Sequence, residues 1–130
     1  MGLADTVRTA DWKLEKHVPA IDCPQRFAAG APTAVTVTVG GSVPHPNTTE
    51  HHIRWVALHF QPTGSQLTFE LGRAEFAAHG ESAAGANQGP AVTAPVASFT
   101  VALKQSGTLH ALAYCNIHGL WAGEAAVVVE

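Results

Sequence analysis

The sequence predicts an all-β fold, a sandwich or barrel of short strands. Apolar residues alternate with polar ones over short runs rich in β-branched side chains, and turns rich in Gly, Pro and Ser separate these runs. No segment keeps a 3.6-residue period. The 130 residues are 46% hydrophobic and 13% charged, as in a globular chain. A chain of this length is expected to form one domain, residues 1–130.

The expected strands follow one another along the chain. The first, Ala34 to Val39, alternates valine with small or polar residues. In the run from Ile53 to Phe60, one face is expected to carry Val56, Leu58 and Phe60, and the other Ile53, Trp55 and Ala57. The remaining expected strands are Leu67 to Leu71, Phe99 to Leu103, Leu109 to Tyr114 and Ala125 to Val129.

One long segment, Ala77 to Pro95, is rich in Ala, Gly and Pro and lacks strand periodicity. A loop of this length in a compact domain is usually functional, interfacial or mobile. The pattern does not distinguish among these roles.

Charge and composition exclude several classes of partner. The net charge is −3 with no basic run, which argues against nucleic acid and anionic membranes. No apolar stretch approaches the ~20 residues that cross a bilayer, and the N-terminus lacks the pattern of a signal peptide. We therefore expect a soluble cytoplasmic protein, in which Cys23 and Cys115 are a free thiol and a metal thiolate instead of a disulfide.

The most informative stretch is Cys115-Asn116-Ile117-His118, because two metal-ligating residues three positions apart can bind one ion from a single turn. Further imidazoles come from His17, which precedes Val18-Pro19, and from His45 and His51 in a Pro-, Asn- and Thr-containing loop. One thiolate with several imidazoles suits a transition metal better than calcium or magnesium. His51 and His52 should face opposite ways, so only one of them is expected in the site.

The residue types leave iron, copper and zinc open. Structural zinc prefers four ligands, commonly with paired cysteines, and this set is larger and richer in nitrogen. Blue copper sites also lie in β-sandwiches and usually add a distant methionine, but the only methionine here is Met1. A glutamine or a backbone oxygen can replace that methionine, which weakens copper without excluding it.

Three motifs in order resemble superoxide reductases of the neelaredoxin and desulfoferrodoxin family: Glu15-Lys16-His17-Val18-Pro19, His45 to Ile53, and Cys115 to Trp121. The resemblance implies one mononuclear iron, Fe2+/Fe3+, with His17, His45, His51 and His118 as equatorial ligands and Cys115 as axial thiolate. It also implies that Glu15 and Lys16 flank an open sixth position. A cysteine-rich N-terminal domain is absent, as in the single-iron class. Since the ligands cluster beside prolines and turns, we expect an immunoglobulin-like β-sandwich with the metal in loops at one end.

The resemblance further implies one-electron reduction of superoxide to hydrogen peroxide, with rubredoxin or a similar small redox protein as electron donor and a homotetramer as the assembly. Lys16 would attract the anion, and Glu15 would occupy the open position once the iron is ferric. A cupredoxin-like electron-transfer protein, a superoxide dismutase using the same site and a non-catalytic β-sandwich carrier are the alternatives. The other conspicuous residues are expected outside the ligand set: His52, His59, His79, His110, Cys23, Trp12, Trp55 and Trp121.

Overall fold

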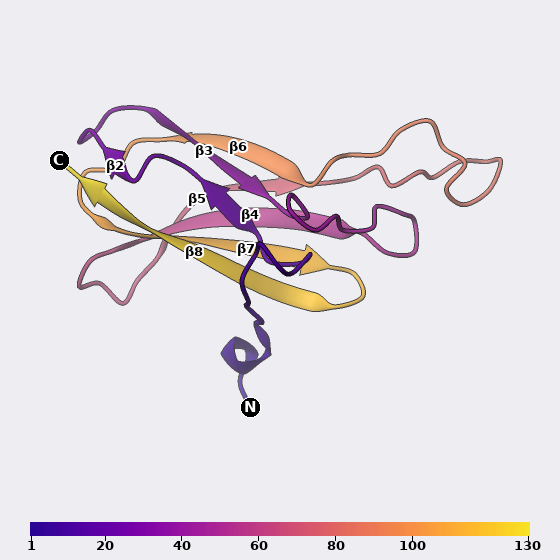
Figure 1. Ribbon diagram of the computed structural model, residues 1–130, viewed down its shortest axis with the longest axis horizontal. Helices are drawn as coiled ribbons and strands as arrows, with labels where there is room; N and C mark the ends of the chain where they lie inside the picture. Colours follow the sequence, from indigo (N-terminus) through magenta and orange to yellow (C-terminus); the bar gives the residue numbers. More distant parts are fainter.

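The computed structural model describes residues 1–130 and consists of two β-sheets that pack against each other (Figure 1). The three-stranded sheet has the order β1 (Ala20–Asp22), β3 (Thr33–Thr38), β6 (Val96–Val101). The five-stranded sheet has the order β2 (Arg26–Phe27), β8 (Gly119–Val129), β7 (Gly107–Cys115), β4 (Ile53–Pro62), β5 (Phe69–Glu75). Apart from these strands there is one short 3-10 helix, η1 (Leu3–Thr6). The predicted all-β sandwich is confirmed.

The core lies between the two sheets and consists of the alternate residues that face inward. Val35 and Val37 of β3 join Leu58 of β4 and Leu109 of β7 in one cluster, and all four are fully excluded from solvent. Burying a side chain of this size stabilises the fold by about 1.5–3 kcal/mol relative to leaving it exposed. The period-two pattern in the sequence therefore marks the face of each strand that packs inward.

Two details of the expected strands were wrong. Ile53 was expected opposite Val56, yet it is buried in the same cluster, because the pairing of β4 with β7 shifts register between Ile53 and Trp55. A bulge of this kind turns a side chain to the other face of the sheet. Leu67 was expected to begin a strand, but it lies before β5 and is exposed. β1 and β2, with three and two residues, are too short to show a periodic pattern.

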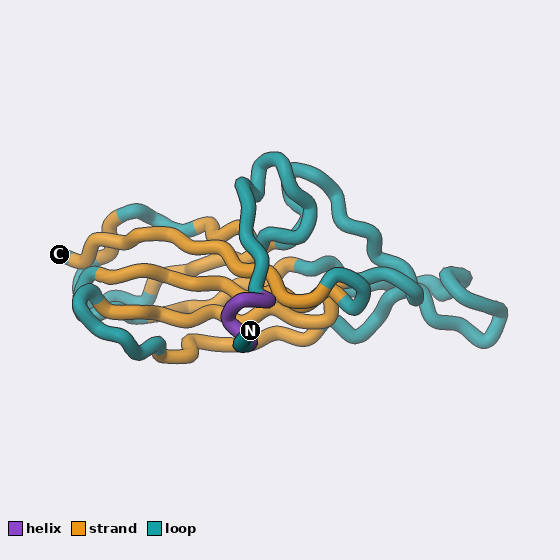
Figure 2. Tube along the Cα trace, turned by 90° about the horizontal axis from the view of Figure 1, so that it is seen from below, coloured by secondary structure: helices purple, strands orange, loops and turns teal.

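Four of the connecting segments gather at one end of the sandwich (Figure 2). They are the segment 11–19 before β1, the loop 39–52 between β3 and β4, the excursion 76–95 between β5 and β6, and the β7–β8 turn 116–118. The excursion projects beyond the sheets, as Figure 1 shows. All the residues expected to bind metal lie at or beside this end. No helix of the protein is long and apolar enough to span a membrane.

Candidate metal centre

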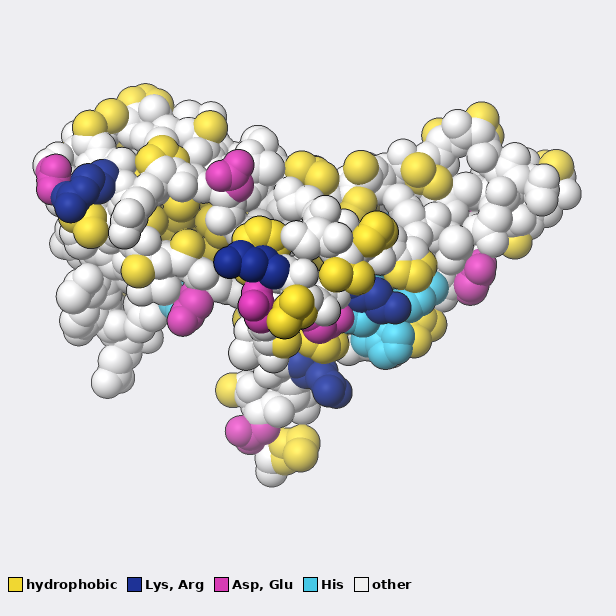
Figure 3. All heavy atoms as spheres, viewed as in Figure 1, with side chains coloured by type: hydrophobic (Ala, Val, Ile, Leu, Met, Phe, Trp, Pro, Cys, Tyr) yellow, Lys and Arg dark blue, Asp and Glu magenta, His cyan; other side chains and the backbone are white.

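Four of the five expected ligands form one compact cluster. One donor atom from each of His17, His45, His51 and Cys115 lies within 4.8 Å of every other. His118 completes the group, since its Nδ1 is 3.1 Å from Nε2 of His17 and 3.8 Å from Sγ of Cys115. Histidine side chains gather on one part of the surface below the base of the excursion, next to Lys or Arg side chains (Figure 3).

The β7–β8 hairpin supplies Cys115 and His118. Cys115 is the last residue of β7 and fully buried, and its register partner is Gly119, the first residue of β8. Gly119 has a φ of 80°, which closes a three-residue turn at little cost because glycine has no Cβ. The turn directs the amide of His118 at Sγ of Cys115, 3.4 Å away. The turn therefore fixes the sulfur and the amide of its fellow ligand in contact with each other.

His17 is fixed by contacts on its outer side. Its Nδ1 lies 2.8 Å from Oε1 of Glu15, whose carboxylate also accepts the backbone amides of Lys16 and His17. The indole of Trp121 stacks on the imidazole with ring centroids 4.7 Å apart. Donating Nδ1–H to a carboxylate leaves the lone pair on Nε2, the nitrogen that faces the cluster. Glu15 thus contacts His17 in this conformation and orients it.

His45 and His51 come from the loop 39–52. Nδ1 of His45 lies 2.6 Å from the carbonyl oxygen of Pro46, which leaves its Nε2 free, 3.5 Å from Sγ of Cys115. Nε2 of His51 is buried and has no hydrogen-bond partner. A buried nitrogen without a partner is costly unless a ligand satisfies it.

Burial keeps these imidazoles neutral at pH 7. Burial, together with smaller contributions from the neighbouring His17, His51 and Lys16, lowers the pKa of His45 to about 4. Burial also lowers the pKa of His17 and of His51. A neutral imidazole has the free lone pair that a metal needs.

The inward atoms therefore form a set of imidazole nitrogens and one sulfur, with no carboxylate oxygen among them. Such a set fits a transition-metal ion and not calcium or magnesium. Lys16, half-buried and directly before His17 in the chain, adds a positive charge close to the cluster.

The residues expected outside the ligand set do lie outside the cluster. His52 turns away from its neighbour His51 and stacks on His79, as the alternation rule predicts. His59 and His110 face each other across β4 and β7. Cys23 is a half-buried free thiol in the segment that follows β1.

Three supporting residues were not identified from the sequence. Trp121 was expected as a core or interface residue, with shielding of the iron as its alternative role, and not as a stacking partner of His17. Asn116 accepts the amide of His52 through Oδ1 and donates Nδ2 to the carbonyl of Glu50. Asn87 makes equivalent contacts from the excursion. Asn116 stands inside the Cys-x-x-His motif, which is a signal that could have identified it; Asn87 stands in a segment without a pattern.

The chain is similar to known proteins over nearly its whole length. A model of the desulfoferrodoxin family matches residues 9–124. A neelaredoxin of Megalodesulfovibrio gigas is 49% identical, with 100% of both chains covered. A superoxide reductase of Pyrococcus furiosus is also 49% identical, covering 94% of this chain and 96% of that protein. The solved structure of the Archaeoglobus fulgidus superoxide reductase (neelaredoxin) in its reduced form has a TM-score of 0.86 and 54% identity, covering 95% of this chain and 98% of that one.

Proposed function

The chain belongs to the desulfoferrodoxin family, and from that membership and the donor cluster we propose that it is a superoxide reductase with one iron per chain. The reaction adds one electron and two protons to superoxide and yields hydrogen peroxide. The observation that supports this most strongly is the convergence of the imidazoles of His17, His45 and His51 on the Cys115 sulfur. Residues 1–130 would form the single iron-binding domain of the neelaredoxin class.

Iron bound by these residues would supply the electron. His17, His45, His51, His118 and Cys115 would hold it. The Cys115 thiolate lies in the core, where no water competes for it, and the amide of His118 limits its negative charge. These two contacts would set how readily the centre gives up its electron.

The charged pair next to His17 would act on the substrate side. Lys16 adds a positive charge near the cluster, which attracts a small anion such as superoxide. Glu15 orients His17 through Nδ1. That Glu15 would occupy the open coordination position in the oxidised protein stays a prediction, because its carboxylate is here hydrogen-bonded to Nδ1 on the outer side of His17.

Two alternatives use the same cluster. A superoxide dismutase would obtain the electron from another superoxide, which is released as oxygen, whereas a reductase needs an external donor. The need for that donor therefore separates the two activities. A cupredoxin-like protein usually has a methionine near its metal, but Met1 is fully exposed before η1. We infer rubredoxin or a similar small protein as donor, a homotetramer as assembly, and the cytoplasm as location, on the basis of the family alone.

The test is metal analysis combined with kinetics on the full chain. We expect about one iron per chain, a visible thiolate-to-iron band after oxidation, and peroxide formation from superoxide that continues only while a donor is supplied. Stoichiometric zinc or copper after growth in iron-replete medium would overturn the iron assignment. Oxygen release without any donor would favour the dismutase.

A further inference from the structure

Two donors come from a loop that has almost no backbone pairing of its own. Between β3 and β4, the only bond of this kind within the stretch 45–52 is the amide of Thr48 with the carbonyl of His51, 3.0 Å apart. The side chain of Thr48 adds a local bond, because its hydroxyl accepts the amide of His51 at 3.1 Å. A loop held by so few bonds is expected to open at a lower cost than a strand of the sheet. The excursion 76–95 lies against this loop.

Asn87, in the excursion, contacts the loop immediately before His51. Its Oδ1 accepts the backbone amide of Thr49 at 2.8 Å, and its Nδ2 donates to Oε2 of Glu50 at 3.0 Å. Asn87 is also the only residue other than glycine with a positive φ, 64°. That conformation is unfavourable for most side chains and is tolerated by asparagine, so the backbone here is set to present this amide.

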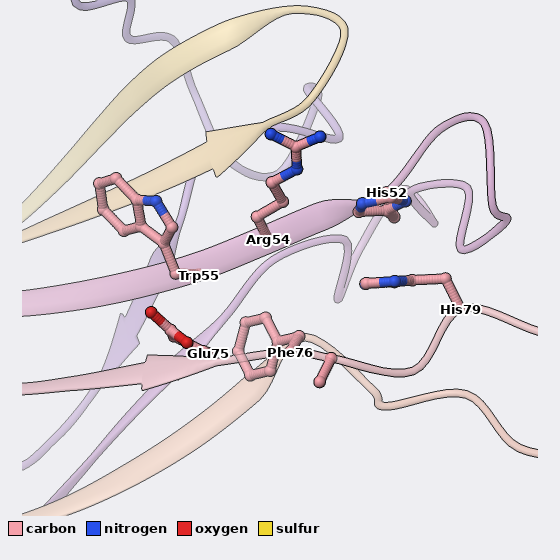
Figure 4. Close-up of a pocket in the computed structure, with 7 residues that line it drawn as sticks. His52, Arg54, Trp55, Glu75, Phe76 and His79 are labelled. Atoms are coloured by element: carbon pink, nitrogen blue, oxygen red, sulfur yellow. The ribbon is translucent and has the colours of Figure 1, made fainter. Parts of the chain in front are cut away.

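A second contact between the excursion and the loop involves His52, the residue after His51. The rings of His52 and His79 stack with centroids 3.5 Å apart and 15° between their planes. Figure 4 shows the two rings one above the other, with His79 extending from the excursion beneath His52. Glu81 fixes His79 by accepting its backbone amide at 2.6 Å. Farther along the excursion, the carbonyl of Thr93 accepts Nδ2 of Asn47 at 3.0 Å.

We propose that the excursion 76–95 is a clamp that sets the metal loop before the metal binds, with Asn87 as its positioning residue. By fixing Thr49 and Glu50, Asn87 determines where the next residue, His51, places its unpartnered Nε2. His79 fixes His52 on the other side of that ligand. The proposal rests on the proposed function for the identity of the metal, but every contact of the clamp joins two protein groups and none involves a ligand atom of the centre.

The test uses Asn87→Gly, which removes the amide while glycine adopts the positive φ without strain. The control is Ser82→Ala, because the Ser82 hydroxyl accepts only the amide of Ala84 within the excursion. In the metal-free full-length protein we expect amide hydrogen exchange at Thr49 to rise about fivefold or more in Asn87→Gly, the factor for one lost hydrogen bond. Exchange in β7 and β8 should not change. Equal exchange at Thr49 in Asn87→Gly, Ser82→Ala and wild type would overturn the clamp.

A second measurement follows the metal-loaded protein. Iron should transfer to a chelator several-fold faster from Asn87→Gly than from wild type or Ser82→Ala, with the thermal midpoint nearly unchanged. A general loss of structure would instead lower the thermal midpoint and the retention of iron together. If the wild type binds no iron, the proposed function fails, and the exchange result on the metal-free chain still decides the clamp.

Discussion

The β7–β8 hairpin and the loop 39–52 each contribute two donors to the same centre, yet they are held in place by different means. The hairpin is paired without a break from Gly107–Val127 to Cys115–Gly119. The loop has no such ladder near His45 and His51. The side-chain amides of Asn87 and Asn116 hold its backbone, and its own Asn47 donates to the carbonyl of Thr93 in the excursion.

This difference implies a division of labour. A ladder buried in a sheet opens only when much of the domain unfolds, whereas a loop held by a few polar contacts opens at lower cost. We therefore expect the position of the sulfur ligand to be insensitive to single substitutions. The positions of the two loop imidazoles should instead depend on single side chains.

The largest expected effect comes from a substitution in the β7–β8 hairpin. Cys115→Ser should abolish the visible band of the oxidised protein, because Cys115 is the only sulfur in the cluster. Cys23→Ser is the matched control, since Cys23 lies outside the cluster and should leave the band unchanged. Visible spectra of both variants at equal iron loading decide the point, and loss of the band in the Cys23 variant would show that the wrong sulfur was assigned.

A smaller effect is expected where the segment bearing His17 meets β8. A Cβ on Gly123 would come 2.2 Å from the carbonyl oxygen of Pro19, two residues after His17. Gly123→Ala should push this segment off the sheet and lower the free energy of unfolding by about 1–3 kcal/mol, the usual cost of overpacking.

Denaturant unfolding of the metal-free protein measures this cost, with Val128→Ala, a partly exposed site on the same strand, as the control. Iron retention should fall with stability, because His17 moves with Pro19. A Gly123→Ala variant as stable as wild type would mean that the segment is not anchored on β8.

A substitution of Asn116, which lies in the β7–β8 turn and contacts the loop 39–52, tests how far one side chain fixes the loop imidazoles. Asn116→Ala removes an acceptor 2.8 Å from the amide of His52 and a donor 2.9 Å from the carbonyl of Glu50. We expect a loss of about 1–2 kcal/mol, from hydrogen bonds of ordinary strength. Faster iron transfer to a chelator, with the sulfur band at its normal wavelength, would show that the loop moved while Cys115 stayed. Asn116→Asp, which retains the acceptor, should lie between Asn116→Ala and wild type.

The same contrast explains how much could be predicted from the sequence. The strands and the hairpin ligands follow from local patterns, namely alternation, turn residues and the spacing of Cys115 and His118. The turn of Ile53 toward the core could not be predicted, because it depends on a register shift against β7. Asn87 could not be predicted either, since its partners Thr49 and Glu50 lie more than 35 residues away and only the folded excursion brings them together.

The smallest effect is expected from a charge that touches neither the ladder nor the loop backbone. Lys16 is half-buried and directly precedes His17, so its positive charge lies close to the donor cluster. Lys16→Ala should leave the iron content unchanged and slow superoxide capture by roughly threefold to tenfold at low ionic strength. Added salt should reduce this difference, because the attraction is screened over about 10 Å at 0.1 M.

Pulse radiolysis over a salt series measures both quantities, with Lys13→Ala as the control. Lys13 carries the same charge three residues earlier, but its ammonium lies over the ring of Trp12, at 5.8 Å from the ring centroid. If the two variants slow capture equally, only the net charge matters and Lys16 has no special position. If Lys16→Ala captures superoxide as fast as wild type and with the same salt slope, attraction by this residue is absent. A larger, salt-sensitive loss in Lys16→Ala alone would place the approach path of the anion beside His17.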